Sequence, residues 1–379
     1  MKRVLSNTQI PKRNLNAYSN QLTVGQANIT IIGCGGAGNN TIDRLMKIGI
    51  RGARCIAINT DQQHLNATQA HEKLLIGKEL TRGLGAGGQP EIGKAAAEES
   101  RHEITQLLQN GDLIFITAGM GGGTGTGSAP VVAEIAKNCG AIVVGVITMP
   151  FHAEMGRMQK AKEGIGILRP YVDTLVLIDN NRLLEIAADL PITEAFSLAD
   201  EVLATMVKGI TETISLPSLI NLDFADIRTI LRTGGVAIVG IGESDESGNR
   251  VESAIEDALN SPLLEFDISG AKGALIHITG GNDLTLIETT KVANVVTERM
   301  DPKAMVIWGA RVDPNLTGVL RVMLLITGVK SPQVLGNTNS KFVSANYVNT
   351  NGRLKPSLAD EFFNINEINS INEENLNLF

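Results

Sequence analysis

The chain has 379 residues, of which 43% are apolar, 19% charged and only 3% aromatic, and its formal net charge is −7. This length accommodates two domains with sizeable cores. The acidic balance argues against binding polyanions through bulk charge, and the scarcity of aromatic side chains argues against stacking on bases, so nucleic acid is not an expected partner.

The sequence shows neither a secretory signal nor a membrane-spanning segment. No apolar run approaches the ~18–20 residues of a membrane-spanning helix, and the basic start of the chain has no long apolar core. The three cysteines form no CxxC pair, which fits a reducing compartment and disfavours a zinc site. We therefore expect a cytoplasmic protein that reaches a membrane only through a partner.

Strands and helices alternate from Asn28 onward. Short β-branched runs predict buried parallel strands, and longer stretches between them predict helices. Such alternation predicts an α/β fold with a doubly wound parallel sheet, in which ligands bind at the carboxyl ends of the strands. The expected strands are 28–33, 53–59, 112–118, 141–148 and 174–179, and the expected helices are 39–48, 90–109 and 127–138.

The second half of the chain begins with a long helix. Apolar residues recur at helical spacing through 193–215, which predicts a helix that bridges two domains. A second, smaller α/β unit follows, with strands at 235–242, 273–279, 304–309 and 319–328 and helices at 251–260 and 284–299. The expected domains are a flexible extension (1–27), a Rossmann-like domain (28–192), a central helix and linker (193–220), a C-terminal α/β domain (221–330) and a flexible acidic tail (331–379).

Three glycine-rich turns, at 33–40, 83–88 and 119–127, fall near predicted strand ends. The last of these contains six glycines within nine residues. A phosphate needs several N–H donors that converge on one point; glycine removes obstructing side chains, and a helix N-terminus adds further free N–H groups. Three such turns can surround a di- or triphosphate.

Two common nucleotide-binding motifs fit less well. Gly33, Gly35 and Gly38 match the dinucleotide fingerprint of a nicotinamide-dependent oxidoreductase, but that alternative leaves the other two turns unexplained. The stretch 88–94 matches the spacing of a P-loop, yet Ala95 stands where Ser or Thr must hold Mg²⁺, so we reject it.

The segment GGGTGTGSAP (121–130) resembles the signature loop of the tubulin and FtsZ superfamily. GCGGAGNNTIDRL (33–45), AINTD (57–61), TRGLGAGG (81–88) and NLDFADIRT (221–229) are more similar to FtsZ, the prokaryotic cell-division GTPase, than to tubulin. The resemblance covers about 28–330, and details such as AGNNT are more similar to archaeal members. It implies binding of GTP and GDP with Mg²⁺ held through phosphates and water rather than by the protein directly, and a monovalent cation as a further candidate.

The resemblance also implies individual roles. Residues implied to bind the phosphates through the first turn are Gly35, Gly36, Ala37, Gly38, Asn39 and Asn40. Those implied to lie near the γ-phosphate and Mg²⁺ are Asn59, Thr60 and Asp61, and those implied to sense the γ-phosphate are Gly85, Ala86, Gly87 and Gly88. The implied cradle of the α- and β-phosphates is Gly121, Gly122, Gly123, Thr124, Gly125, Thr126 and Gly127.

Three more residues complete the implied site. Glu154 and Arg157 flank the ribose and phosphates, although this segment is one residue shorter than the E-G-x-x-R of the family. Asp200, on the long helix, takes the guanine edge, because guanine offers paired N–H donors that a carboxylate accepts.

Asp223 and Asp226 are three residues apart, so on one helical turn both carboxylates face the same way. They follow the long helix, which carries them to the opposite end of the domain, so they make sense as an intermolecular site. The resemblance implies that they polarise the attacking water at the neighbouring subunit's nucleotide, in a head-to-tail homopolymer that forms a filament. We expect a GTP-dependent polymerising GTPase that builds the division ring at midcell, with anchoring or regulatory proteins on the tail. A scaffold that binds GTP but hydrolyses it poorly remains the structural alternative.

Overall fold

The computed structural model of the chain describes residues 27–181, 192–215, 219–220, 222–232, 234–246, 248–260 and 270–329, without the side chains of 192–199 and 202. The expected N-terminal extension, apart from Ala27, and the expected acidic tail lie outside the described residues. Among the described helices, none combines the length and the apolar character that a bilayer span requires.

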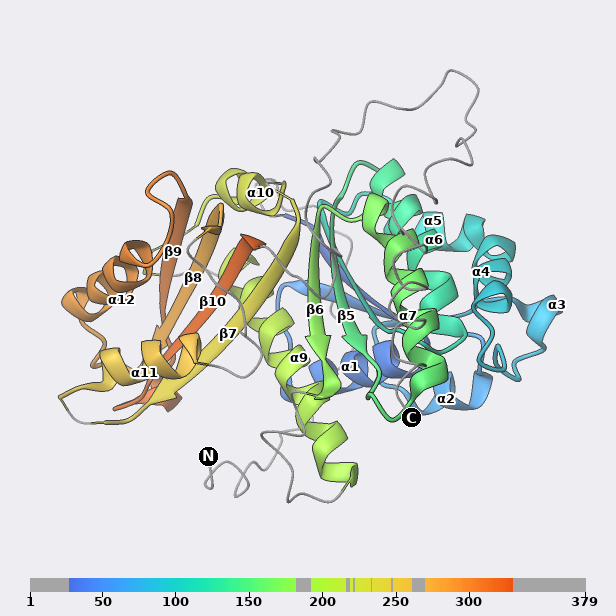
Figure 1. The fold of residues 1–379 in the computed structure, drawn as a ribbon, viewed down its shortest axis with the longest axis horizontal. Coiled ribbons are helices and arrows are strands. Elements are labelled where there is room, and N and C mark those ends of the chain that lie inside the picture. Colours follow the sequence, from blue (N-terminus) through green and yellow to red (C-terminus); the bar gives the residue numbers. More distant parts are fainter. Residues whose placement is uncertain are drawn as a thin grey trace, which may run out of the picture.

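The first half is a six-stranded parallel sheet with helices on both faces (Figure 1). The central strands are buried along their whole length or along all but their last residue, as the continuous apolar runs predict. The doubly wound sheet is thus confirmed. Its strands, in spatial order, are β3 (Glu72–Leu75), β2 (Ala53–Asn59), β1 (Ile29–Cys34), β4 (Leu113–Gly119), β5 (Ile142–Met149) and β6 (Thr174–Asp179). Its helices are α1 (Gly35–Ile48), α2 (Gln62–Ala67), α3 (Lys78–Thr81), α4 (Pro90–Glu99), α5 (Arg101–Leu108), α6 (Thr124–Asn138) and α7 (Met155–Leu168).

The second half is smaller and its sheet is mixed. β8 and β9 run parallel, whereas β10 pairs antiparallel with both β7 and β8. A separate apolar cluster fills the space between these strands and two helices. Its strands are β7 (Val236–Ser244), β8 (Gly273–Gly280), β9 (Met305–Val312) and β10 (Leu320–Val329), and its helices are α10 (Phe224–Arg232), α11 (Arg250–Leu259) and α12 (Leu286–Glu298).

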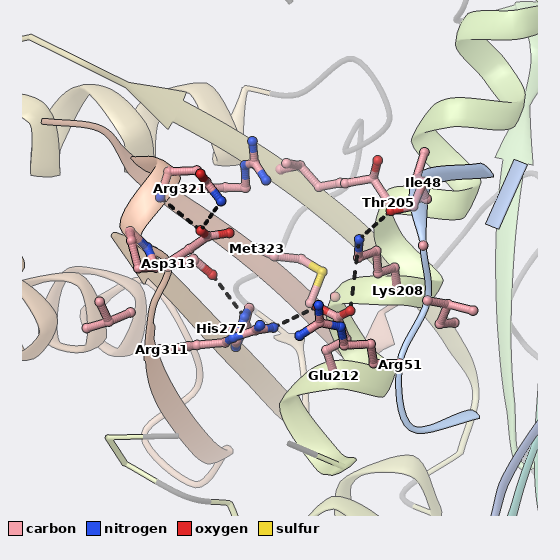
Figure 2. Close-up of a pocket in the computed structure, with 18 residues that line it drawn as sticks. Ile48, Arg51, Thr205, Lys208, Glu212, His277, Arg311, Asp313, Arg321 and Met323 are labelled. Carbon is pink, nitrogen blue, oxygen red and sulfur yellow. Dashed lines mark hydrogen bonds and ion pairs between the residues drawn. The ribbon is translucent and has the colours of Figure 1, made fainter. Parts of the chain in front are cut away.

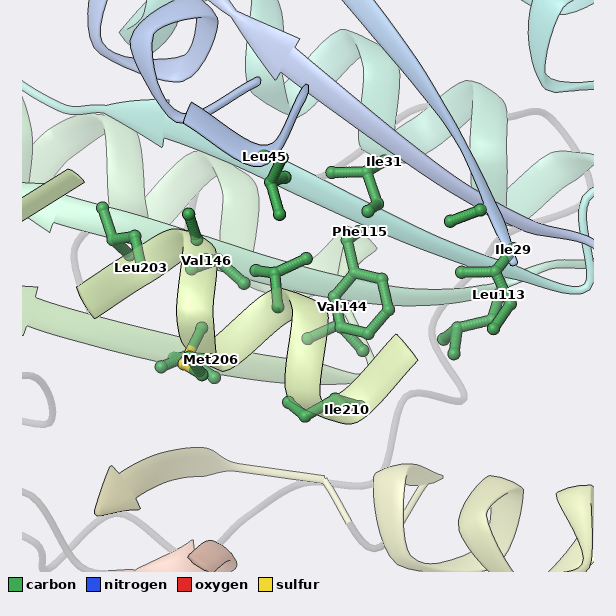
Figure 3. Packing of buried hydrophobic residues seen from close by; sticks show 14 of the residues in the cluster. Ile29, Ile31, Leu45, Leu113, Phe115, Val144, Val146, Leu203, Met206 and Ile210 are labelled. Atoms are coloured by element: carbon green, nitrogen blue, oxygen red, sulfur yellow. The ribbon is translucent and has the colours of Figure 1, made fainter. Parts of the chain in front are cut away.

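The long helix α9 (Ile192–Ser215) lies between the two halves (Figure 1). Leu203, Met206 and Ile210 are buried in the same cluster as Phe115 and Val144 of the first sheet (Figure 3). The cluster continues into strands of the second half. The predicted bridging helix is confirmed, and its packing rather than a flexible linker holds the halves together.

One connection was not foreseen from the sequence. β6 and β7 pair in parallel through two residues each, Leu175 with Val236 and Val176 with Ala237. The two units therefore share a single ten-stranded sheet. Strand pairing between distant segments leaves no local signal in the sequence, which predicts two α/β units but not the strands that join them.

Some expected boundaries were wrong. α1 begins at Gly35 rather than at residue 39. Packing requires glycine within its first turn, since a Cβ on Gly38 would lie 2.3 Å from the Thr117 carbonyl oxygen. The single helix expected at 90–109 is two helices, α4 and α5, which meet at Ser100. The short strand β3 and the helices α2, α3 and α7 were not predicted.

Candidate functional site

The first and third glycine turns meet at the carboxyl edge of the central strands. β1 and β4 are neighbours in parallel register, and each leads into a helix. The helix starts touch: a Cβ on Gly35 would lie 2.7 Å from the backbone nitrogen of Gly125. Only glycine at this position, with φ of +72°, allows α1 and α6 to begin side by side.

Both helices begin without a side-chain cap. Neither Cys34 before α1 nor Gly123 before α6 accepts a hydrogen bond from the first turn. Asp61 caps α2 and Thr285 forms a capping box at α12, whereas α3, α4, α5, α7 and α11 also lack a side-chain cap; α1 and α6 differ from these in starting side by side. The first N–H groups of an uncapped helix have no intrahelical acceptor, so two sets of donors and two helix dipoles converge here. This is the arrangement that binds phosphate.

The glycines of these turns divide into two kinds. Around Gly36 and Gly122 nothing lies within 4 Å of an added Cβ, so their backbone borders open space. Gly127 is different, because a Cβ there would lie 2.0 Å from the Pro90 carbonyl oxygen on α4. Gly127 therefore serves the packing of α6 against α4, and the cradle is open mainly along 35–36 and 121–122.

Polar side chains at the end of β2 and on α1 fix this cradle from one side. Thr60 is fully buried, and its hydroxyl lies 2.6 Å from that of Thr124. Asn39 is fully buried too; with its amide oriented to match donors with acceptors, its Nδ2 lies 2.9 Å from the Gly33 oxygen and its Oδ1 3.1 Å from Nδ2 of Asn59. These side chains join the turns to one another.

Asp61 and Thr126 also have partners within the chain. Asp61 Oδ1 accepts a hydrogen bond from the His64 backbone at 3.0 Å, and the Thr126 hydroxyl accepts one from the Gly121 backbone at 2.9 Å. Both side chains therefore fix the turns that they belong to. Neighbouring Gly36, Ala37 and Asn40 are exposed and free of such packing.

The second glycine turn lies beside the other two. The φ angles of Gly85, Gly87 and Gly88 are +88°, +58° and +71°, a conformation that side chains disfavour. The Gly85 backbone N–H donates to the Thr60 carbonyl at 3.0 Å, and Ala86 is buried. Lys160 of α7 donates to the Gly88 carbonyl at 2.8 Å. Lys160 was not among the predicted site residues, although it follows Arg157 by three residues on one helix.

The shortened segment begins α7 next to the third turn. Glu154 precedes the helix and forms an ion pair with Arg157. The backbone of Arg157 packs against Gly121, where a Cβ would lie 2.7 Å from the Arg157 oxygen. Both residues thus lie at the α7 end of the cradle.

Asp200 lies on α9 where this helix packs against α1. The adjacent Glu201 forms an ion pair with Arg44 of α1 at 2.6 Å. Burial raises the pKa of the Asp200 carboxyl to about 6, and the nearby Asp43 raises it further while Arg44 opposes the shift. Arg44 has no signal in the sequence that marks it as a neighbour of Asp200.

Asp223 and Asp226 lie far from these turns. Asp223 precedes α10 and its Oδ1 accepts from the Ala225 backbone at 2.9 Å; both acids are exposed. Thr174, the first residue of β6, donates to the Leu231 carbonyl near the end of α10 at 2.6 Å. Since the first and third glycine turns follow the last residues of the parallel strands β1 and β4, α10 lies at the opposite edge of the sheet (Figure 1).

Within the described part of the chain, no three His, Cys, Asp or Glu residues gather where they could hold a metal ion. A magnesium ion carried on nucleotide phosphates requires no such group.

Comparison with known proteins identifies the family. Residues 28–188 match the model of the tubulin/FtsZ family GTPase domain, and residues 235–330 match that of the FtsZ family C-terminal domain. The chain belongs to the tubulin/FtsZ family. It therefore carries an FtsZ-type GTPase domain that binds guanine nucleotides, and the uncapped starts of α1 and α6 form part of that domain.

Related proteins are similar along most of their length. The chain is 59% identical over 314 residues to Cell division protein FtsZ 2 of Methanocaldococcus jannaschii, covering 82% of this chain and 83% of that protein. It is 53% identical over 317 residues to Cell division protein FtsZ 2 of Haloferax volcanii, covering 84% and 79%. The predicted similarity to archaeal FtsZ is confirmed.

Solved structures agree in fold. An empty FtsZ dimer from M. jannaschii matches with a TM-score of 0.78 at 55% identity, covering 81% of this chain and 90% of that one. CetZ2 from Haloferax volcanii, at 24% identity and a TM-score of 0.68, shares the fold.

Proposed function

We propose that this FtsZ-family GTPase polymerises head to tail when it binds GTP, and hydrolyses the nucleotide at the junction between two subunits. The opposed placement of the glycine turns and of Asp223 and Asp226 carries the proposal. β6 alone, with six residues, separates the two edges by about 20 Å. No side chain spans that distance, so the acids of one chain do not reach its own phosphates.

GTP hydrolysis requires both the phosphate cradle and the two acids, Asp223 and Asp226. The phosphate cradle binds and positions the nucleotide, but in-line attack also needs an oriented water whose charge is stabilised as it develops. In a head-to-tail stack, the α10 end of one subunit meets the open cradle of the next. Asp223 and Asp226 then polarise the attacking water, and Mg²⁺ carried on the phosphates neutralises charge there. A monovalent cation is a further candidate at the junction.

Several features support self-assembly. Exposed Leu80 and Leu84 border the second glycine turn, and exposed Leu219 lies shortly before α10. Apolar side chains at both ends of the stack suit a contact that buries them. The solved structure of FtsZ from M. jannaschii described above is that of a dimer. Because the contact is heterologous and does not close on itself, it generates a filament.

The cellular role follows from the relatives. Their names describe cell division proteins, so we propose that the filament forms the division ring in the cytoplasm at midcell. Anchoring or regulatory proteins would bind the acidic tail (331–379) and connect the filament indirectly to the membrane.

The test measures GTP turnover per subunit as protein concentration rises, with sedimentation of the same samples. We expect negligible turnover below a threshold concentration and pelletable polymer at that same threshold. Turnover per subunit that is constant across concentrations would show that one chain completes the site. Tight GTP binding without turnover at any concentration would favour a scaffold.

A further inference from the structure

A polar cavity of about 570 Å³ opens between α9 and the sheet of the second half (Figure 2). None of its lining residues belongs to the glycine turns. Its contribution from the first half is the turn after α1, at the far end of that 14-residue helix from Gly35, which is about 20 Å away. The cavity is therefore separate from the nucleotide site.

Cationic side chains enter this cavity from both walls. Arg51 and Lys208 come from the turn after α1 and from α9, while Arg311 and Arg321 come from β9 and β10 (Figure 2). Two carboxylates, those of Glu212 and Asp313, also line it. In a chain whose net charge is −7, this is a local excess of positive charge.

Ion pairs neutralise only part of that excess. Glu212 pairs with Arg311 at 2.7 Å and lies 3.9 Å from Lys208, and Arg321 pairs with Glu243, outside the cavity lining. No hydrogen bond or ion pair joins Arg51 to the residues that the structure describes. One guanidinium is thus available to a ligand.

His277 adds a buried polar atom without a partner. The side chain is 7% exposed, its Nε2 lies 3.0 Å from the Thr279 hydroxyl, and its Nδ1 has no hydrogen-bond partner in the described structure. Burial, with Arg311 and Arg321 nearby, lowers the pKa of His277 to about 4, so the ring is neutral near pH 7. When Thr279 donates to Nε2, Nδ1 carries the hydrogen, although this atom is itself buried behind the cavity lining.

We propose that this cavity binds a small molecule with two anionic groups, each a phosphate or a carboxylate. Arg51 and Lys208 would hold one group, and Arg311 of the opposite wall would hold the other. The guanidinium fork matches both kinds of anion. Because the walls belong to halves whose strands pair through only two residues each, the bound dianion would tie the halves together. The proposal is independent of GTP turnover.

The test is calorimetric titration of the full chain, saturated with GDP in magnesium-free buffer so that the nucleotide site is filled. The probes are fructose 1,6-bisphosphate and citrate, with fructose as the uncharged control. We expect saturable binding of at least one anionic probe without release of GDP, and none of fructose. Which probe binds more tightly distinguishes phosphate from carboxylate.

Three variants assign the binding to the cavity. Arg51→Gln should weaken the affinity about tenfold, since one charge-assisted contact is lost. Asp313→Asn should strengthen it, because a carboxylate leaves the lining while the cap at Asn315 is kept. Arg299→Gln removes the same charge from an exposed residue outside the cavity, so it should leave the affinity for the anion unchanged. No binding of either anion, or equal affinities in all three variants, would overturn the proposal.

Discussion

At the scale of single residues, the environment of Asp200 sets a pH requirement. The family resemblance implies that Asp200 takes the guanine edge, and its carboxyl would have to be ionised to accept the paired N–H donors of guanine. Burial raises its pKa to about 6. A raised pKa means that the acid is protonated below about pH 6 and ionised above it. The unbound site is therefore competent at neutral pH and loses its acceptor as the pH falls.

We accordingly expect GTP affinity to be constant between about pH 7 and 8 and to fall toward tenfold per unit below about pH 6. Asp200→Asn should bind GTP weakly and show no such decline. It should instead favour xanthosine triphosphate, because an amide both accepts from N1–H and donates to the 2-oxo group. Nucleotide titrations between pH 5 and 8 measure this, and an unchanged pH profile in the variant would exclude Asp200 from the guanine edge.

Individual residues also show how much of the candidate site the sequence could predict. The motif resemblance selected the segments that form the cradle, but it did not separate residues that border open space from those that hold the turns. Asn39 and Gly127 were both assigned to phosphate, yet one is fully buried among chain atoms and the other allows α6 to pack on α4. That distinction depends on contacts between segments distant in sequence.

At the scale of elements, close packing of α4 and α6 fixes one wall of the cradle. A Cβ on Gly127 would lie 2.0 Å from the Pro90 oxygen, and one on Gly93 would lie 2.3 Å from the Gly123 oxygen. Both of these carbonyl oxygens are backbone atoms, so an added Cβ could be accommodated only if the helices moved apart. The start of α6 would move with them.

Gly127→Ala should therefore lower the free energy of unfolding by about 1–3 kcal/mol and weaken nucleotide binding as well. Gly166→Ala is the matched control, because this exposed position in α7 has nothing within 4 Å of an added Cβ. That change should stabilise the protein by about 0.5–1 kcal/mol. Urea unfolding with and without GDP makes the comparison, and equal stability of the two variants would contradict the packing argument.

Elements with strong local patterns were predicted well, and the exceptions have physical causes. β6 and the buried parallel strands have continuous apolar runs. The start of α1 was placed four residues late, since helix propensity counts against the glycines that tertiary packing requires there. The short β3 is only partly buried and lacks the strong apolar run that marks the central strands.

At the scale of the whole molecule, the single ten-stranded sheet gives the chain two unlike ends. One end presents the glycine turns and the other presents α10. The sequence indicated this polarity through the order of motifs along the chain, whereas the joining of β6 to β7 became visible only in three dimensions.

A mixing experiment tests whether the two ends cooperate. Asp226→Ala should bind GTP normally and lose turnover, and Asp200→Asn should lose turnover with GTP because it binds GTP poorly. In an equal mixture, about a quarter of the junctions would combine an intact pocket with intact acids if subunits join head to tail at random. We expect GTP turnover to recover to about that fraction. No recovery, although the two variants sediment together, would argue against a shared site.

If nucleotide binds at the adjoining starts of α1 and α6, as we propose, the stability of the fold depends on that ligand. In the empty protein, no side chain accepts hydrogen bonds from the first N–H groups of these two helices. The phosphates of a bound nucleotide would accept them. A ligand that binds only the folded chain adds about 2.7 kcal/mol of stability at one hundred times its dissociation constant. The lifetime of this protein in a cell would then follow the guanine nucleotide pool, so that starvation would deplete the protein itself as well as its substrate.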